Sequence, residues 1–448
     1  MMRINLLFIL QISLLNSIKC IHFYKDEILF SDRTYPNYKF HVLHHLSGIS
    51  PYFSSNTDKL SPSIPSECLV DKTAYLIRHG SVYVDDYDYL KIIEPFLKRI
   101  KSQNFSQSNI FSFLSQWKSP ITNSKKQIEK LTRYGYFEAY QFGIELSYRY
   151  KHLLPKNNSN SFRIWTASSS RTYQSALAIS QGLFQGEKTS AKLISISEKK
   201  SRGGNTLTPT KSCHKYNASK GSIEANYWLK IYTKSILKKF NKNISNFQFI
   251  PEDILAMQEL CGYETIIKGQ SKFCRLFSSE DWISFEYYFD LKYFYEISYG
   301  NYLSTYLGMP WIKATIDLFF KEKQTKQNLF LSITHREMFP LILNALGLFN
   351  QTNLSLNQID HQRLWKTSEI LPFLARIAFE RLQCGTEIFI RILINSTPKP
   401  IPYCSQGPGQ SCPLSLFLNY IQQRYLKFKD FSQICQNQNQ INHFTFFN

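Results

Sequence analysis

The stretch Ala74-Tyr-Leu-Ile-Arg-His-Gly80 carries the strongest structural and chemical signal of this chain. Its first four residues form an apolar run, which is typical of a buried strand. Arg78, His79 and Gly80 follow where that strand would turn into a loop. A neutral imidazole is a good nucleophile toward phosphorus, a guanidinium forms bidentate hydrogen bonds with phosphate oxygens, and glycine lets a ligand approach the backbone. The stretch therefore predicts a phosphate-handling site at the end of a strand.

Two further apolar runs lead into polar residues of the same kind. Phe162-Arg-Ile-Trp165 precedes Arg171, whose small polar neighbours can begin a helix that favours anions at its N-terminus. Leu329-Phe-Leu-Ser-Ile-Thr334 precedes His335 and Glu337. In an open α/β sheet, ligand sites lie beyond the carboxyl ends of the strands. We therefore expect these side chains to converge with those of the first stretch.

The alternation of strand-like and helix-like segments predicts an α/β fold with a doubly wound, mostly parallel sheet and an inserted helical cap region. Glu387-Ile-Phe-Ile-Arg-Ile-Leu-Ile394 is a further expected strand, and an insertion between two strands can cover an active cleft. The predicted organisation is a signal peptide at 1–20, an N-terminal lead segment at 21–66, a first part of the α/β core at 67–194, a mainly helical cap insertion at 195–325, a second part of the core at 326–397, and a disulfide loop, closing helix and tail at 398–448.

Residues 1–20 have the pattern of a secretory signal peptide. Arg3 gives a positive start, and Leu6–Leu10 with Ile12–Leu15 gives a short apolar stretch. An uncleaved anchor is the alternative, but the stretch is short and polar for a membrane span, and no later run approaches the roughly twenty apolar residues that a span needs. We therefore expect a secreted or cell-wall protein in an oxidising environment, with no stable membrane span after signal removal.

The chain of 448 residues has a formal net charge of +20 at pH 7, and 43% of its residues are hydrophobic. This composition indicates a folded globular protein. The charge is compatible with nucleic-acid binding, with attraction of a polyanionic substrate or wall surface, and with a solvated lysine-rich surface. Because the lysines are spread and no zinc finger or other DNA-binding motif accompanies them, we expect no nucleic-acid partner. The sequence leaves the oligomeric state open.

Segments spread over most of the chain share one resemblance. The clearest are Tyr38–Tyr52, Cys68–Gly80, Leu131–Gly135, Leu260–Glu264, Phe285–Tyr295 and Cys404–Cys412. They are similar to the histidine acid phosphatases, the large branch of the histidine phosphatase superfamily, and among these to secreted fungal acid phosphatases and phytases. His335-Arg-Glu337 is similar to the His-x-Glu version found in multiple inositol polyphosphate phosphatases. The resemblance implies a phosphoglycerate mutase-like fold.

The resemblance also implies hydrolysis of phosphate esters at acidic pH through a phosphohistidine intermediate. His79 would attack phosphorus, while Arg78, Arg171 and His335 would bind the phosphate oxygens. Glu337 would protonate the leaving group. No metal and no other cofactor is required, because protein groups supply both the nucleophile and the positive charge. Phytate, other inositol phosphates and generic phosphomonoesters all stay open as substrates.

Two residues of this set have a simpler interpretation. Glu337 also suits the first turn of a helix, where the helix dipole favours an acid, and both interpretations can hold at once. Lys292, within Asp290–Tyr295, resembles a substrate-binding lysine of fungal phytases. It could instead be a solvated lysine between buried aromatic residues.

The chain departs from the family pattern Arg-His-Gly-x-Arg-x-Pro directly after the expected nucleophile. Val82 stands at the position of the second arginine, and Val84 at that of the proline. A charge-assisted hydrogen bond contributes about 1.5–3 kcal/mol, so we expect a weakened enzyme unless another cation, such as a lysine from 195–325, compensates. The alternative is a catalytically weak or silent cell-surface protein that binds phosphate or inositol phosphate. The signal peptide and disulfides argue against a phosphomutase of the same superfamily.

The cysteines predict disulfides rather than a metal site. The chain has nine, and the predicted signal peptide removes Cys20. The family resemblance implies the pairs Cys68–Cys384, Cys213–Cys435, Cys261–Cys274 and Cys404–Cys412. No Cys-x-x-Cys pair occurs in the sequence, which argues against metal binding.

The sequence also contains several sequons for N-glycosylation, and a glycan would keep the loop that carries it at the surface. Sequons occur at Asn104, Asn157, Asn217, Asn243, Asn350, Asn353 and Asn395.

Overall fold

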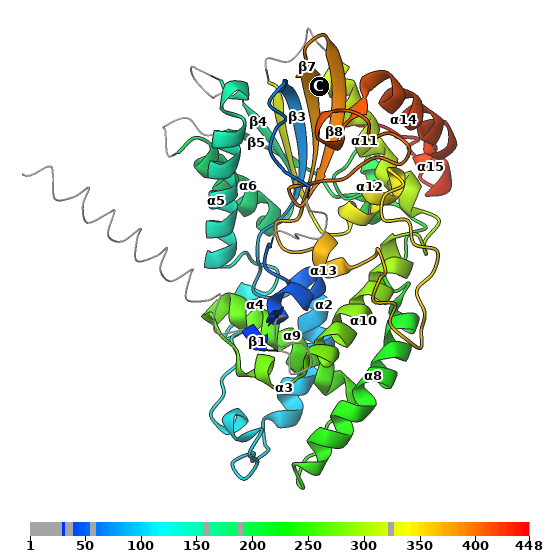
Figure 1. Ribbon diagram of the computed structural model, residues 1–448. Helices are drawn as coiled ribbons and strands as arrows, with labels where there is room; N and C mark the ends of the chain where they lie inside the picture. The colour runs from blue at the N-terminus through cyan, green and yellow to red at the C-terminus, as the bar shows by residue number, and fades with distance from the viewer. Residues whose placement is uncertain are drawn as a thin grey trace, which may run out of the picture.

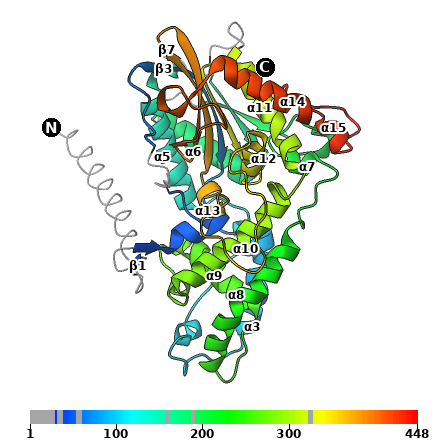
Figure 2. The ribbon, with the colours of Figure 1, turned by 45° about the vertical axis from the view of Figure 1, so that its right-hand side comes forward.

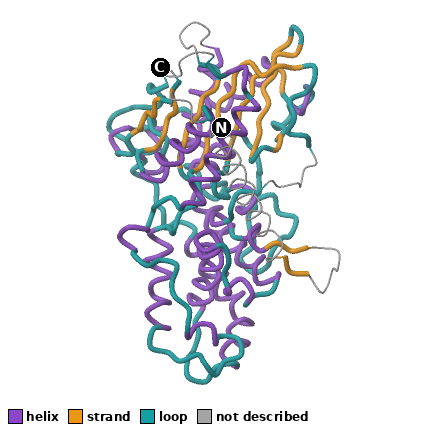
Figure 3. Tube along the Cα trace, turned by 90° about the vertical axis from the view of Figure 1, so that its left-hand side faces the viewer, coloured by secondary structure: helices purple, strands orange, loops and turns teal. Residues whose placement is uncertain are grey.

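The protein has an upper part built on a β-sheet and a lower part built of helices (Figure 1). Its computed structural model describes residues 29–31, 39–53, 60–155, 162–185, 191–320 and 327–447. The predicted signal peptide and the sequon at Asn157 lie outside these residues. Figure 3 shows the strands of the main sheet gathered in the upper part, whereas the lower part is mainly helical, with one short strand pair, β1 (Leu29–Ser31) and β2 (Lys39–His41), beside it. The two parts meet where the strands of the sheet end.

The main sheet has eight strands, and most of them run in the same direction. Parallel pairing joins β5 (Lys192–Ile196), β4 (Arg163–Ala167), β6 (Leu329–Thr334) and β3 (Cys68–Arg78) in that order. Antiparallel pairing then adds β7 (Arg376–Cys384), β8 (Glu387–Ile394), β9 (Thr397–Pro398) and β10 (Cys412–Pro413). The predicted α/β class with a mostly parallel sheet is confirmed. The strands expected at 329–334 and 387–394 have these same bounds.

Helices cover both faces of the sheet, which explains the apolar runs in its central strands, such as Ala74–Ile77 of β3. On one face, Tyr75 and Ile77 of β3 belong to an apolar cluster that also contains residues of α5 (Arg133–Arg149) and α6 (Ser170–Leu183). Ala74 and Leu76 belong to the cluster on the opposite face. That face is covered by α11 (Ser304–Phe320), α12 (Met338–Ala345) and α14 (Leu414–Phe428) (Figure 2). Because successive side chains of a strand point to opposite faces, those of the predicted apolar run are divided between two cores.

The lower part, which we call the helical lobe, is built around three long helices, α8 (Ser222–Lys242), α9 (Pro251–Lys268) and α10 (Ser279–Ile297). The short helices α2 (Asp86–Asp88) and α3 (Glu94–Ile100), which follow β3 in the chain, lie with them (Figure 1). α11 also falls within the predicted cap range 195–325, but it packs against α12 beside the sheet. The helical region that the sequence predicts is therefore present, and its domain boundaries stay a prediction.

Four disulfides cross-link the structure: Cys68–Cys384, Cys213–Cys435, Cys261–Cys274 and Cys404–Cys412. These pairs are the ones that the family resemblance implies. Cys68 and Cys384 are directly opposite each other on β3 and β7, and 316 positions separate them in the sequence. In the part of the chain that the structure describes, no helix is both long and apolar enough to cross a bilayer.

One sequon does not have the surface position expected of it. The described sequon asparagines at 104, 217, 243, 350 and 353 are exposed, but Asn395 is buried. Its Nδ2 donates a hydrogen bond to the carbonyl of Glu369 at 2.5 Å, and its Oδ1 accepts one from the Arg376 backbone at 2.9 Å. The side-chain amide that would carry a glycan is therefore bound within the fold, and Asn395 is not available for glycosylation once the protein has folded.

We expect the Cys68–Cys384 bond to stabilise the protein by about 2–5 kcal/mol, because it closes a very long loop of the unfolded chain. The double variant Cys68→Ala/Cys384→Ala should therefore unfold at a clearly lower urea concentration under non-reducing conditions. Cys404→Ala/Cys412→Ala is the matched control, because its cysteines are only 8 positions apart. A larger loss of stability in this control would contradict the loop-length argument.

Candidate active site

The expected site residues come together at the carboxyl ends of three parallel strands. Arg78 ends β3 and His79 follows it, while Arg171 lies in the first turn of α6, after β4. His335 and Glu337 follow β6, with Glu337 at the N-cap of α12. The Nε atom of Arg171 lies 3.2 Å from Nε2 of His79, and the rings of His79 and His335 are 5.6 Å apart between centroids.

The backbone after His79 turns in a tightly packed environment. A side chain on Gly80 would overlap the backbone of Gly135 at the start of α5, so only glycine fits there. The Gly80 backbone donates to Ser175 Oγ at 3.0 Å. Glu138 Oε1 accepts from both the backbone and the hydroxyl of Ser81 at 2.6 Å. These contacts fix the path of the chain after β3, and they thereby fix the position of the His79 imidazole.

His79 is held in the tautomer that a nucleophile requires. Its Nδ1 lies 2.9 Å from the Gly80 carbonyl, which can only accept, so Nδ1 donates and Nε2 keeps its lone pair. Arg171 Nε donates to that lone pair. Burial, together with the nearby Arg171 and Arg78 cations, holds the pKa of His79 well below its usual range. The imidazole therefore stays neutral under acidic conditions, which is its nucleophilic form.

Arg78 is fully enclosed beside the imidazole. Its Nη1 donates to the carbonyls of Gly48 at 2.7 Å and Leu371 at 2.5 Å, and the guanidinium lies 4.3 Å from the Phe373 ring centroid. Its Nε is buried and has no hydrogen-bond partner among the described residues. Burial lowers the pKa of Arg78 to about 9, and the nearby Arg336 contributes to this shift. A buried guanidinium with a free donor is suited to an anionic ligand.

His335 has a partner that the sequence did not reveal. Its Nε2 donates to Glu198 Oε1 at 2.9 Å, and Lys211 Nζ donates to Glu198 Oε2 at 2.7 Å. Burial favours the neutral form of Glu198, but His335 and Lys211 outweigh it and lower the pKa of Glu198 to about 2. His335 Nδ1 is buried and has no hydrogen-bond partner in the described part of the chain. Glu198 therefore orients the ring and leaves Nδ1 for a ligand.

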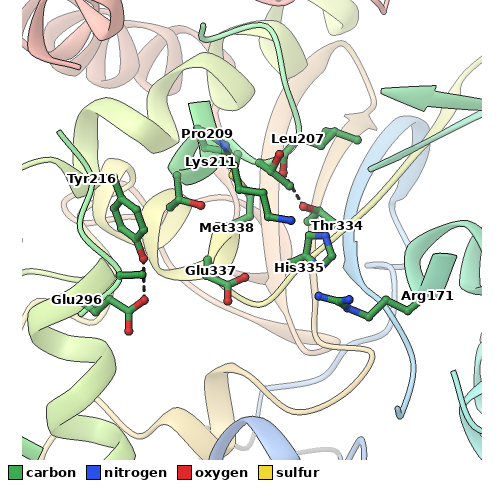
Figure 4. A pocket seen from close by; sticks show the side chains of 13 residues that line it. Arg171, Leu207, Pro209, Lys211, Tyr216, Glu296, Thr334, His335, Glu337 and Met338 are labelled. Atoms are coloured by element: carbon green, nitrogen blue, oxygen red, sulfur yellow. Dashed lines mark hydrogen bonds between the residues drawn. The ribbon is translucent and has the colours of Figure 1, made fainter. Parts of the chain in front are cut away.

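A pocket lies between the sheet and the helical lobe, next to these residues (Figure 4). Arg171, His335 and Glu337 line it from the sheet side, and Tyr216 and Glu296 lie opposite them. Tyr216 donates a hydrogen bond to Glu296 at 2.7 Å, and burial raises the pKa of Glu296 to about 7. The pocket thus has cationic groups on one side and a carboxyl group that is protonated in acid on the other.

Glu337 combines the two positions that the sequence predicts for it. It is the N-cap residue of α12, and it also lines the pocket. Burial favours its neutral form, but the cation of Arg336 and the nearby His335 outweigh burial and hold the pKa of Glu337 below its usual range. Arg336 Nε lies 3.4 Å from Glu337 Oε1. In the free protein Glu337 is therefore a carboxylate beside a guanidinium.

Lys292 lies in α10, where it is 8% exposed. Its Nζ is 4.6 Å from the ring centroid of Tyr87 and 5.7 Å from that of Tyr293. The lysine is thus buried among aromatic rings rather than solvated, and it is not among the side chains that line the pocket. Its predicted contact with substrate stays a prediction.

Three carboxylates near the site lie close enough together for a metal to be considered. Oxygen atoms of Asp85, Asp86 and Glu129 lie within 4.8 Å of one another. Glu129 forms an ion pair with Arg171, and Asp85 forms one with Arg336 at 3.3 Å. Guanidinium groups therefore compensate two of the three charges, and this cluster supplies counter-charges to the cations of the site.

Comparison with known proteins gives one consistent result. The model of the histidine phosphatase superfamily (branch 2) matches residues 70–395. An acid phosphatase of Komagataella pastoris is 27% identical over 421 residues, covering 90% of this chain and 89% of the relative. A phytase of Candida albicans is 27% identical over 397 residues, covering 86% of this chain and 85% of the relative.

Solved structures show the same fold. The crystal structure of the phytase from D. castellii matches with a TM-score of 0.86 at 24% identity, covering 94% of each chain. A multiple inositol polyphosphate phosphatase from Bifidobacterium longum matches with a TM-score of 0.62 at 12% identity, covering 84% of this chain and 97% of the other. The family and fold that the sequence indicates are confirmed.

The Glu198 contact predicts a measurable change in the titration of His335. Burial holds the pKa of His335 below its usual range, and the Glu198 carboxylate opposes this by favouring the imidazolium, so the pKa of His335 should fall further when glutamine replaces Glu198. Histidine resonances in an NMR pH titration give this value directly. Lys211→Gln is the control, because it leaves the bond between Glu198 and His335 in place. An unchanged His335 pKa in Glu198→Gln would contradict the assigned contact.

Proposed function

Because this chain belongs to branch 2 of the histidine phosphatase superfamily and is a phosphatase, we propose that it hydrolyses phosphomonoesters in two steps, with His79 as the nucleophile. The observation that carries the proposal is the state of His79. Its Nδ1 proton is held by the Gly80 carbonyl, and its Nε2 lone pair faces Arg171. A phosphate bound by Arg171 would present its phosphorus atom to that lone pair.

In the first step, Nε2 of His79 forms a bond to phosphorus while the bond to the leaving alkoxide breaks. Negative charge on the transferring group is spread over its equatorial oxygens. Arg78 and Arg171 supply guanidinium donors to these oxygens, and the protonated ring of His335 supplies a further donor from Nδ1, because its Nε2 already donates to Glu198. The product is a phosphohistidine, which water hydrolyses in the second step.

Glu337 is the proposed proton donor to the leaving alkoxide, and as a carboxylate it then activates the water of the second step. Its pKa is held below its usual range in the free protein, so the protonated form is lost as the pH rises through that low pKa. His79 stays neutral as the pH falls, because its pKa is also depressed. Both shifts place the active protonation state in the acidic range.

We further propose a polyanionic phosphate ester, such as an inositol phosphate, as the substrate class. The net charge of +20 attracts such a molecule. Lys211 lies at the pocket and is half-exposed, so it can bind a second phosphate group. A phytase is among the relatives of this chain. A secreted or cell-wall location is proposed from the signal-like residues 1–20 and the four disulfides.

A silent phosphate-binding protein is the second candidate, and Val82 is the observation that favours it. Its side chain is apolar and 4% exposed, so it offers no positive charge to a phosphate. The neutral imidazole of His79 and the carboxyl of Glu337 argue for catalysis, because phosphate binding alone requires neither. Turnover of p-nitrophenyl phosphate at acidic pH in EDTA decides between the two.

His79→Ala should lower turnover by at least about 10³-fold while the fold is kept, because the nucleophile is removed from a loop. A ³²P-labelled substrate, quenched in alkali to preserve phosphohistidine, should label the wild-type chain and not the variant. His361→Ala, at an exposed position, is the control and should label normally. Label on His79→Ala would exclude His79 as the acceptor.

A further inference from the structure

The position at which the family pattern has its second arginine offers no charge here. Val82 belongs to an apolar cluster, and its backbone forms a bridge with Leu131. The guanidiniums of Arg78 and Arg171 therefore supply the positive charge next to His79. Any further cation must reach the site from another element. Such a cation lies on the loop that follows β6.

Arg336, between His335 and Glu337, reaches across to the loop after β3. Its Nη2 donates to Asp85 Oδ2 at 3.3 Å, and Asp85 is three residues beyond Val82. The guanidinium lies 5.3 Å from the ring centroid of Tyr293, and the side chain is only 13% exposed. The positive charge of Arg336 is thus enclosed beside the segment in which the second arginine is absent.

Arg336 and Arg78 lie against the same small surface. A methyl group built on Gly48 would be 3.7 Å from Nη1 of each of the two arginines. Like charges this close repel strongly in a buried site. Each of these guanidiniums also has a buried Nε without a hydrogen-bond partner among the described residues, although that of Arg336 is 3.4 Å from Glu337. Two neighbouring cations with spare donors are suited to an anion that both can bind.

We propose that Arg336 is a phosphate-binding residue that replaces, from the β6 loop, the guanidinium missing at Val82. This inference rests on the proposed phosphatase function. It also differs from the expectation of a compensating lysine in 195–325, because the cation comes from the core and lies next to the proposed acid. Asp85 compensates part of the charge of Arg336 through one nitrogen, Nη2, and leaves the other donors of the guanidinium for phosphate.

The test moves the arginine from position 336 to position 82, the place it has in the family pattern. Arg336→Met should raise both KM for p-nitrophenyl phosphate and the inhibition constant of inorganic phosphate, and lower kcat/KM by about 10- to 100-fold. Val82→Arg alone should give no gain, because Arg336 already supplies the charge. The double variant Val82→Arg/Arg336→Met should recover at least about tenfold over Arg336→Met. A gain in rate from Val82→Arg alone would overturn the proposal.

Arg99→Met is a matched control. Arg99 also pairs with an aspartate, Asp253, at 3.1 Å, and its guanidinium lies 5.1 Å from the Phe247 ring centroid. It is on α3 in the helical lobe, so its removal should leave KM and phosphate inhibition unchanged. The melting temperatures of both single variants should be compared, because Arg336 could act only as a structural partner of Asp85.

Asp85→Asn separates the structural role from the binding role, and it remains informative if Arg336→Met does not fold. It weakens the ion pair while keeping the guanidinium, so phosphate affinity should be retained. A loss of affinity as large as that in Arg336→Met, or an Arg336→Met protein that binds phosphate normally and only melts earlier, would overturn the proposal. Binding of inorganic phosphate by calorimetry tests Arg336 even if the wild type turns over no ester, an outcome that would refute the proposed function instead.

Discussion

The site depends on one electrostatic constraint: buried cations surround a neutral imidazole. Burial lowers the pKa of both Arg78 and Arg171, and Arg336 lies close enough to each of them to add to this shift. Repulsion of this kind is strong where water is excluded. Each cation is therefore partly compensated, Arg171 by Glu129 and the others by carbonyl or carboxylate oxygens. A phosphate dianion among them would supply negative charge to all three, which favours its binding over that of a neutral molecule.

The fold meets this constraint by distributing the cations over separate elements. Each parallel strand contributes residues at its carboxyl end, and helices on both faces of the sheet fix the directions in which the chain leaves it. The helical lobe closes the other side with Tyr216 and Glu296. The like charges come from different strands, so no single segment has to hold them side by side. The packing of the sheet and its helices offsets the repulsion between them.

Sequence reasoning succeeded where a signal was local. The runs ending at Arg78 and Thr334 are apolar because both faces of their strands are covered, so their strand positions were predictable. Glu198 lies just after the end of β5, but it was missed because that strand is only partly buried and lacks a long apolar run, and because His335 is 137 positions away. Arg336 lies inside the motif His335–Glu337, but its proposed role was inferred from its positions beside Gly48 and Asp85, which are remote in sequence. Buried Asn395 shows the same limit for a sequon.

The neighbouring positions of Arg336 and Glu337 connect phosphate binding to proton transfer. In the free protein, Arg336 is the foremost charge that keeps Glu337 ionised against the effect of burial. A phosphate dianion bound to Arg336 would offset that cation and place negative charge near the carboxyl, and both effects raise the pKa of Glu337. The acid would then take up its proton when the substrate that needs it is bound. An arginine at position 82 could bind phosphate, but it would not be the sequence neighbour of Glu337. Placing the cation on the β6 loop therefore links the pKa of Glu337 to phosphate binding, in addition to providing a contact with the substrate.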